Sequence, residues 1–330
     1  MPARHRAVAL AKSRRSAWRR LLAWLVGIIV VGSLPACAYL DTKQRELIFR
    51  PVKAERPGYQ QQTDGVESIW LPVVRAGKPT GDRLHAWWWP HSDPNAPSLL
   101  YLHGTRFNLS GSAFRIARLR SMGFNVLAVD YRGFGQSSGD LPSEHWAYED
   151  ASIAWAHLVE REPDPRRRFV YGHSLGGAVA VDLATRTDGI AGVIIESTFT
   201  TMRDMADTTI ARYLPVSWIL TQRFDVLSKM PKVRAPLLIV HGTGDRYVPY
   251  QMSERLFAAA PDPKRLLLVD NATHSNTAWI GFDVYAQAVA AMTLGGRAPV
   301  APTAAITPAS ITPASDTRDL GSAGTSRGTP

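Results

Sequence analysis

Cysteine is nearly absent from this sequence of 330 residues, which contains Cys37 alone. A single cysteine excludes an intramolecular disulfide framework and a cysteine-based zinc site, and we expect no bound metal. Hydrophobic residues make up 45% and charged residues 20% of the sequence. These proportions are ordinary for a globular protein that buries a sizeable core, so general disorder is excluded as well.

Acidic side chains are absent from the first 20 residues, where seven lysines and arginines lie. The formal net charge of +10 therefore falls to +3 for the rest of the chain. The folded part is only mildly basic, which argues against a nucleic-acid partner. Positive charge concentrated at one end instead indicates membrane orientation, with that end on the cytoplasmic side.

Charge is also absent from residues 21–40, whose core from Leu21 to Val31 is strongly apolar. Residues 1–40 therefore read as a signal peptide or as a transmembrane anchor, because about 20 helical residues span a hydrocarbon core. Leu34-Pro35-Ala36-Cys37 resembles a bacterial lipobox with an atypical proline, in which Cys37 would be lipidated and begin a mature lipoprotein. Either alternative places the rest of the chain on the non-cytoplasmic side, periplasmic or extracellular.

Beyond the apolar segment we expect a lead-in at residues 41–65 that packs on the outside of the domain, a main domain at 66–296 and a disordered Pro/Thr/Ala-rich tail at 297–330. Within the main domain, continuous apolar runs alternate with helical patterns, which predicts an α/β fold with a doubly wound, mostly parallel sheet. Residues 197–231 interrupt the alternation and are expected to form a small helical cap. The expected strands are 66–74, 84–89, 98–102, 125–129, 169–171, 193–195, 237–240 and 266–269, and the expected helices are 113–121, 144–160, 178–185, 251–259 and 278–292.

A nucleophile elbow is indicated where the apolar strand Phe169-Val170-Tyr171 runs into Gly172-His173-Ser174-Leu175-Gly176-Gly177 and then into a helical pattern. Gly-x-Ser-x-Gly in a strand–turn–helix context presents a serine on a sharp turn. Small residues at Gly172 and Gly176 let the helix close against the strand. Ser174 is therefore the candidate nucleophile.

A serine hydroxyl needs a base at neutral pH, and the base needs an orienting acid. Of the nine histidines, His274 lies in a polar loop after the last strand and is the candidate base. We interpret the others as structural residues. Asp245, in the loop after the preceding strand, is the candidate acid, although it could instead cap a helix. Glu196, which ends the strand 193–195, is the alternative acid.

A tetrahedral intermediate also requires two backbone donors for its oxyanion. The N–H of Leu175, directly after the nucleophile, is one candidate. The second is the N–H of Thr105, because Gly104 allows the chain to turn after the strand 98–102.

These motifs together resemble the α/β-hydrolase superfamily over about residues 66–292. The resemblance rests on His103-Gly104, the 130–137 loop, the elbow, the loop from Gly242 to Pro249, and His274. It implies an eight-stranded, mostly parallel sheet and acyl-enzyme chemistry without a cofactor. Within the superfamily the chain is similar to small-cap, membrane-attached hydrolases related to protein-depalmitoylating thioesterases, and more loosely to the monoacylglycerol-lipase and serine-aminopeptidase-like groups. The bulky pair Arg106-Phe107 departs from the small residues usual in the oxyanion loop.

The sequence therefore predicts a membrane-attached serine hydrolase that cleaves carboxylic esters or thioesters of small-molecule or lipid-like acyl substrates. A peptidase of the serine-aminopeptidase type is the enzymatic alternative. A non-catalytic binding protein on the same fold is the alternative from another class.

Overall fold

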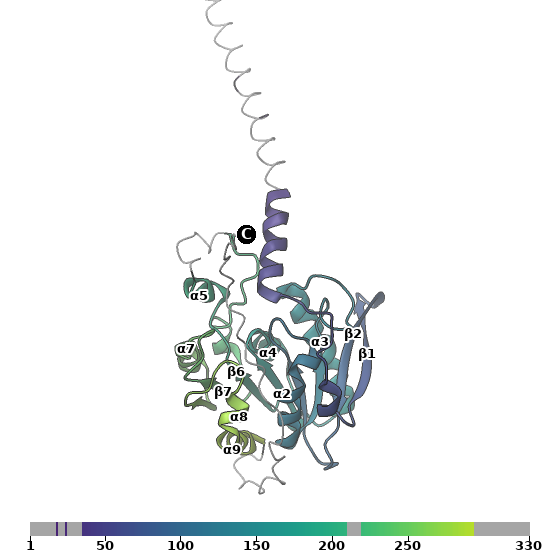
Figure 1. Ribbon diagram of the computed structural model, residues 1–330, viewed down its shortest axis with the longest axis vertical. Helices are drawn as coiled ribbons and strands as arrows, with labels where there is room; N and C mark the ends of the chain where they lie inside the picture. The colour runs from purple at the N-terminus through teal and green to yellow at the C-terminus, as the bar shows by residue number, and fades with distance from the viewer. Residues whose placement is uncertain (1–17, 19–23, 25–34, 210–218, 294–330) are drawn as a thin grey trace, which may run out of the picture. The chain divides into compact units, whose positions relative to one another are not determined.

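The computed structural model describes residues 35–209 and 219–293, together with Trp18 and Trp24. Its centre is a sheet of eight strands in the order β1-β2-β4-β3-β5-β6-β7-β8 (Figure 1). β1 pairs antiparallel with β2 and β2 with β4, and all other pairs are parallel. The predicted doubly wound, mostly parallel fold is therefore confirmed. The strands are β1 (Glu67–Arg75), β2 (Lys78–Trp89), β3 (Ser98–Leu102), β4 (Asn125–Val129), β5 (Arg168–His173), β6 (Gly192–Glu196), β7 (Leu237–Gly242) and β8 (Lys264–Val269).

Helices cover both faces of the sheet, as long apolar strands require. One face packs against α3 (Glu144–Arg161), α4 (Leu175–Arg186) and α7 (Gln251–Ala259). The other packs against α2 (Leu109–Ser121), α8 (Thr277–Ile280) and α9 (Phe282–Thr293). The short elements are α5 (Met202–Asp207) and the 3₁₀ helices η1 (Tyr59–Gln62), η2 (Pro165–Arg167) and η4 (Met230–Lys232).

The tryptophan run at the end of β2 shows how the sheet divides the core. Trp87 and Trp89 pack in the cluster that includes α2 and α9, whereas Trp88 packs in the cluster that includes α3 and α4. Successive strand side chains point to opposite faces, so three consecutive tryptophans serve both layers. The sequence predicts such a strand with two buried faces, and the prediction is confirmed.

Three helix predictions differ from the structure by more than one residue. Helix α2 begins at Leu109, four residues before the expected start. The elbow helix α4 begins at Leu175, three residues before the expected start. The expected helix 278–292 is two helices, α8 and α9, which are separated at Gly281. A Cβ at Gly281 would lie 2.7 Å from Cγ1 of Val269, so the chain passes very close to β8 there. The apolar periodicity continues across the break, which is why the sequence pattern did not reveal it.

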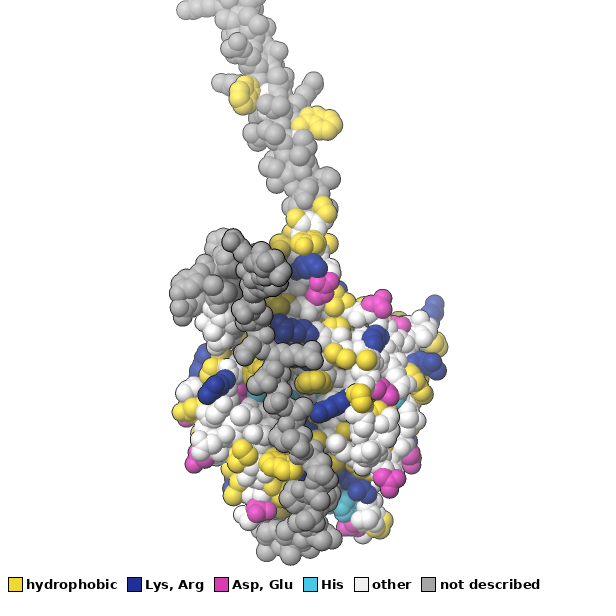
Figure 2. Space-filling model, viewed as in Figure 1, with side chains coloured by type: hydrophobic (Ala, Val, Ile, Leu, Met, Phe, Trp, Pro, Cys, Tyr) yellow, Lys and Arg dark blue, Asp and Glu magenta, His cyan; other side chains and the backbone are white. Residues whose placement is uncertain are grey.

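Most of the predicted N-terminal segment lies outside the described residues, as do the tail at 297–330 and part of the cap, residues 210–218. Residues 35–49 are helical, and Cys37 is exposed on that helix. Figure 2 shows hydrophobic side chains on this helix, and Tyr39, Leu40 and Leu47 are among the exposed ones. Among the residues that the structure describes, no helix is both long enough and apolar enough to span a bilayer.

The lead-in segment corrects one expectation. Residues 41–65 were expected to pack on the outside of the domain, but Phe49 is fully buried in the core. Its ring lies 5.7 Å from that of Phe224, which lies within the expected cap at residues 197–231. The expectation is wrong at Phe49 because the short apolar run Leu47-Ile48-Phe49, flanked by Glu46 and Arg50, carries no periodic signal.

Candidate active site

The candidate residues gather at one edge of the sheet because they follow the carboxyl ends of parallel strands. Ser174 follows β5, Asp245 follows β7 and His274 follows β8. Ser174 is half-buried and has φ 55° and ψ −119°, a conformation that is rare for a residue with a side chain. Its N–H donates to the carbonyl of Glu196 at 2.8 Å, which ties the turn to the end of β6.

Three glycines around Ser174 leave no space for a side chain. A Cβ at Gly172 would lie 2.2 Å from the carbonyl oxygen of Gly176, and a Cβ at Gly176 would lie 2.1 Å from that of Leu102. At Gly177 the Cβ would lie 1.8 Å from Oγ1 of Thr198. The elbow therefore forms only because helix α4 starts in direct backbone contact with β3 and β5.

We expect Gly176→Ala to destabilise the protein by at least about 3 kcal/mol, the upper end of the usual cost of overpacking, because its new methyl group would overlap backbone. Gly123→Ala is the matched control, since Gly123 has φ 99° and open space around its Cα. That change adds backbone strain of about 1–2 kcal/mol and no overlap. Urea unfolding of the two variants measures the difference, and equal losses would contradict the packing argument.

His274 and Asp245 are in direct contact. Nδ1 of His274 lies 2.7 Å from Oδ2 of Asp245. Oδ1 of Asp245 accepts the N–H groups of Tyr247 and Val248, at 2.8 Å and 2.9 Å. Asp245 does not cap α7, whose first turn follows Tyr250. Both carboxylate oxygens are thus held, one by its own loop and one by the histidine.

The environment keeps Asp245 ionised. Burial alone would raise the pKa of its carboxyl group. Hydrogen bonds from His241 and His274 outweigh burial, so the pKa lies well below its ordinary value. An ionised Asp245 orients the His274 ring with its Nδ1–H toward the carboxylate, which leaves Nε2 as the nitrogen that can face the nucleophile.

His241 supports the acid from the other side. Its Nε2 lies 2.9 Å from the carbonyl of Val248 and 3.2 Å from Oδ2 of Asp245, and its Nδ1 lies 2.6 Å from Oγ of Ser253. An Nε2–H tautomer fits all three contacts, because Ser253 can donate to Nδ1. The sequence predicts a structural, hydrogen-bonded histidine here but does not reveal its contact with Asp245.

The loops that carry Asp245 and His274 are hydrogen-bonded to each other. The N–H of Thr243 donates to the carbonyl of Val269, and the N–H of Gly244 donates to that of Ala272. His173, inside the elbow, has Nε2 2.9 Å from the carbonyl oxygen of His274. Burial lowers the pKa of His173 well below its ordinary value, so a neutral ring donates this bond. The elbow therefore positions the backbone of His274 directly.

Glu196, the alternative acid, is fully buried, and its carboxylate oxygens contact residues other than His274. Oε2 accepts the hydroxyls of Tyr171 at 2.8 Å and Tyr285 at 3.0 Å. Oε1 accepts the hydroxyl of Thr277 and lies 3.4 Å from Nε of Arg115. Arg115 also donates to the carbonyl of Ser275, next to His274. Glu196 thus braces the segment after His274, and the contact with the His274 ring is made by Asp245.

The two candidate oxyanion donors belong to the elbow and to the loop after β3. Leu175 is the first residue of α4, where an N–H has no partner within the helix. Thr105 follows Gly104, at which a Cβ would lie 3.2 Å from both Cβ of Ser174 and the carbonyl of His173. The loop with Thr105 therefore passes very close to the elbow.

The residues after Thr105 reach the neighbourhood of His274. Arg106 has φ 74°, and its guanidinium lies 5.7 Å from the centre of the Tyr247 ring. Tyr247 in turn lies 5.7 Å from the ring of His274. Phe107 and Tyr247 are both more than half exposed. Arg106 thus adds a cation next to the ring that neighbours His274, whereas the Phe107 ring lies against Gly111.

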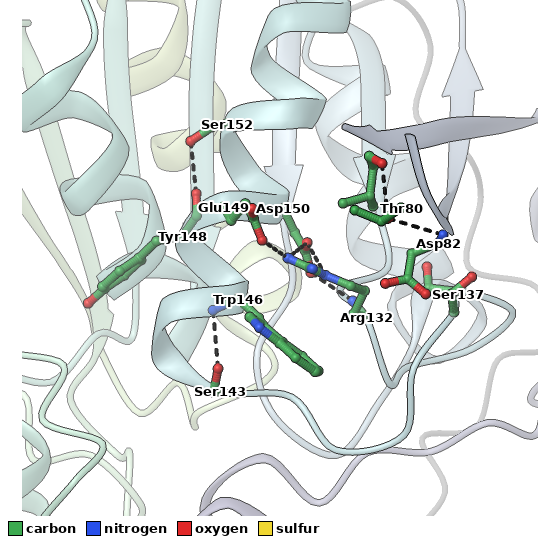
Figure 3. Close-up of polar contacts among 12 residues, drawn as sticks. Thr80, Asp82, Arg132, Ser137, Ser143, Trp146, Tyr148, Glu149, Asp150 and Ser152 are labelled. Atoms are coloured by element: carbon green, nitrogen blue, oxygen red, sulfur yellow. Dashed lines mark hydrogen bonds and ion pairs between the residues drawn. The ribbon is translucent and has the colours of Figure 1, made fainter. Parts of the chain in front are cut away.

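The 130–139 loop is fixed to α3 by Arg132, which is almost completely buried (Figure 3). Its backbone N–H and its Nε donate to the two oxygens of Asp150, at 2.8 Å and 2.7 Å. Its guanidinium also pairs with Glu149 and lies 4.9 Å from the Trp146 ring. Burial raises the pKa of Asp150 to about 6, whereas hydrogen bonds, first from Arg75, lower that of Glu149 to about 2. This network holds the 130–139 loop against α3. Its hydrogen bonds and ion pairs do not include Ser174, Asp245 or His274.

Other kinds of site are not indicated at this edge. Within residues 35–209 and 219–293, no group of three or more His, Cys, Asp or Glu side chains is placed to hold a metal ion. A surface hollow of about 570 Å³ lies between α3 and α4, lined by Tyr148, Glu149, Asp182 and Arg186 among others. None of the candidate catalytic residues lines it.

Comparison with known proteins agrees with the fold. Residues 94–225 match the family described as serine aminopeptidase, S33. Alpha/beta hydrolase domain-containing protein 17B of Xenopus tropicalis is 32% identical over 232 residues, which cover 69% of this chain and 77% of the relative. Lysophosphatidylserine lipase ABHD12 of Danio rerio is 29% identical over 286 residues, covering 75% of this chain and 74% of the relative. The esterase Pf2001 of Pyrococcus furiosus shares the fold with a TM-score of 0.60 at 18% identity, covering 74% and 98% of the two chains.

Proposed function

Because the chain belongs to the α/β-hydrolase superfamily, we propose that it is a serine hydrolase that cleaves carboxylic esters or thioesters through an acyl-enzyme intermediate. One observation carries the proposal. Nδ1 of His274 lies 2.7 Å from an ionised Asp245, and both follow parallel strands that end at the same edge of the sheet as the strained turn of Ser174. This constellation has the chain order and the acid–base contact that nucleophilic acyl transfer uses.

In the proposed mechanism, Nε2 of His274 takes the proton from Oγ of Ser174 as Oγ attacks the carbonyl carbon. Asp245 holds the ring and stabilises the imidazolium that forms. The N–H groups of Leu175 and Thr105 donate to the oxyanion. His274 then gives the proton to the leaving alcohol or thiol, and water repeats the cycle to release the acid. No step requires a cofactor.

Two comparisons favour ester substrates with lipid-like acyl groups. One relative is named as a lipase and one solved structure as an esterase. We propose that this chain takes small-molecule or lipid-like acyl esters. Labelling by a fluorophosphonate, followed by hydrolysis of nitrophenyl esters of increasing chain length, tests both the reaction class and the acyl preference. Absence of labelling in folded protein would favour the non-catalytic binding protein.

A peptidase of the serine-aminopeptidase type is the second candidate, favoured by the matching family description. Such an enzyme needs an acid to hold a free amino terminus. Glu196 is buried against Arg115, and Asp204 on α5 pairs with Arg255 at 3.0 Å. Because an arginine already pairs with each of these acids, ester cleavage is the better supported activity. Cleavage of aminoacyl nitroanilides faster than of matched esters would reverse this preference.

We further propose that the N-terminal segment attaches the enzyme to a membrane, with the catalytic domain on the non-cytoplasmic side. The helix over residues 35–49 is hydrogen-bonded to the domain. Gln44 contacts the carbonyl of Ile219 and the N–H of Thr221, both at 2.8 Å, and Arg45 donates to the carbonyl of Pro142 at 2.8 Å. These contacts lie after Cys37, so a lipoprotein and an uncleaved anchor would both keep them.

The two N-terminal alternatives predict different molecules. A lipoprotein begins at Cys37, lacks the basic segment, and incorporates a palmitate analogue that Cys37→Ser abolishes. An anchored protein keeps Arg4 and incorporates no label, whether or not Cys37 is replaced. Intact mass of the protein from its native membrane distinguishes them. A mature chain that starts elsewhere, without lipid, would contradict both.

A further inference from the structure

Residues 49–56, which we call the strap, lie across the loop that carries the candidate oxyanion donor. The N–H of Arg106 donates to the carbonyl of Phe49 at 3.0 Å. Nδ2 of Asn108 donates to the carbonyls of Val52 and Ala54, at 3.3 Å and 2.9 Å. Three carbonyls of the strap, those of Phe49, Val52 and Ala54, thus accept hydrogen bonds from the segment that follows Thr105.

The strap also joins this loop to the 130–139 loop. The N–H of Gly135 donates to the same Val52 carbonyl at 2.9 Å. Nζ of Lys53 donates to the carbonyls of Ser137 and Gly139, at 3.0 Å and 2.7 Å. Since Arg132 fixes that loop to α3, the strap is held on a rigid part of the fold.

The loop itself contains a strained turn directly after Thr105. The N–H of Phe107 donates to the carbonyl of Thr105 at 2.9 Å, and Arg106 between them has φ 74°. A three-residue turn with this hydrogen bond and a positive φ is a γ-turn of the rare, strained kind. A non-glycine residue keeps such a conformation only where its surroundings hold it. The carbonyl of Phe49 is the partner that holds Arg106.

We propose that the strap is a positioning element for the oxyanion loop and that Asn108 is its positioning residue. This proposal rests on the proposed function, since it assigns the strap to a hydrolase site. The turn at Arg106 orients the peptide groups on both sides of Thr105. Release of the strap lets the turn relax, and the N–H of Thr105 then no longer points at the developing oxyanion. The strap continues the N-terminal helix, so the segment proposed to attach the enzyme to a membrane also helps to build its site.

Asn108 offers a test because its two side-chain atoms have separate partners. Oδ1 accepts the hydroxyl of Ser110 at 2.6 Å and caps α2 through the N–H of Gly111 at 3.4 Å, whereas Nδ2 reaches the strap. Asn108→Ser keeps a good helix cap and removes the two hydrogen bonds from Nδ2 to the strap. Asn125 is a matched control at the start of β4. Its Oδ1 accepts the N–H of His91 and its Nδ2 donates to the carbonyl of Ala96, both at 2.8 Å.

The experiment compares Asn108→Ser with Asn125→Ser in the full chain. Two readouts are taken: kcat and KM for a nitrophenyl ester, and the inhibition constant of a trifluoromethyl ketone with the same acyl chain. The ketone forms a tetrahedral adduct with the nucleophile and so reports on the oxyanion donors. Loss of a whole donor costs roughly 10²–10³ in kcat, and we expect misplacement of one to cost about 10- to 100-fold. The same factor should appear in the inhibition constant, with KM little changed, for Asn108→Ser alone.

Two results would overturn the proposal. One is that both variants lose similar thermal stability while both keep kcat and ketone affinity. The other is that Asn108→Ser raises KM with kcat intact, which would assign Asn108 to substrate binding. If the wild-type enzyme itself fails to bind the ketone or turn over esters, the proposed function fails first, and the strap proposal fails with it. Should Asn108→Ser not fold, Lys53→Met weakens the other attachment of the strap, and we expect the same signature at smaller size.

Discussion

Ser174→Ala should abolish ester turnover and fluorophosphonate labelling while the melting temperature stays within about 2 °C of the wild type. The hydroxyl is the proposed nucleophile, and no other side chain at the elbow can form the acyl-enzyme. The half-buried side chain is small, so its loss removes little packing. Activity assays, labelling and thermal unfolding on the same preparations check the three parts of this expectation.

Ser197→Ala is the matched control for the nucleophile. Ser197 follows β6 as Ser174 follows β5, and it also has a positive φ, 53°. It is fully buried, so neither substrate nor probe can reach it. This variant should keep its labelling. Labelling that persists in Ser174→Ala would show a different nucleophile and would overturn the assignment of the elbow.

Asp245→Asn should lower kcat by about 10⁴, because an amide at this position no longer holds His274 in the correct tautomer and orientation. The expected loss follows from the 2.7 Å contact with Nδ1 of His274 and from the low pKa that keeps the carboxylate ionised. The melting temperature should fall as well, since His241 shares the same oxygen at 3.2 Å. Steady-state kinetics below the melting transition separate the two effects.

Glu196→Gln is the comparison for the acid. The change leaves Arg115 without its buried counter-charge, and breaking such a pair costs on the order of 3 kcal/mol of folding free energy. Turnover by the folded fraction should fall far less than in Asp245→Asn, because Glu196 braces the segment around Thr277 and Tyr285. If Glu196→Gln proves the more damaging to kcat, Asp245 is only a loop residue and the triad is wrong.

The strands show most clearly how much of the fold can be predicted from the sequence. β3 and β4 have the predicted bounds, and helix α7 does as well. Continuous apolar runs can be recognised in the sequence because a strand buried on both faces needs an apolar residue at every position. α8 and α9 were merged into one prediction because the break at Gly281 depends on contact with Val269, across the fold.

Local motifs in the sequence by themselves determined the fold class and the candidates Ser174, Asp245 and His274. Glycines beside a serine and loops after apolar strands are local features, and parallel topology alone brings strand ends to one edge. Only the tertiary structure decided which acid meets His274, that His173 and His241 support this pair, and that Phe49 holds Arg106. Each of these is a hydrogen bond or ion pair, between two side chains, between a side chain and a carbonyl, or between two backbone groups. Its partners are chosen by the spatial separation of atoms to within a few tenths of an ångström, which the spacing of residues along the chain does not encode.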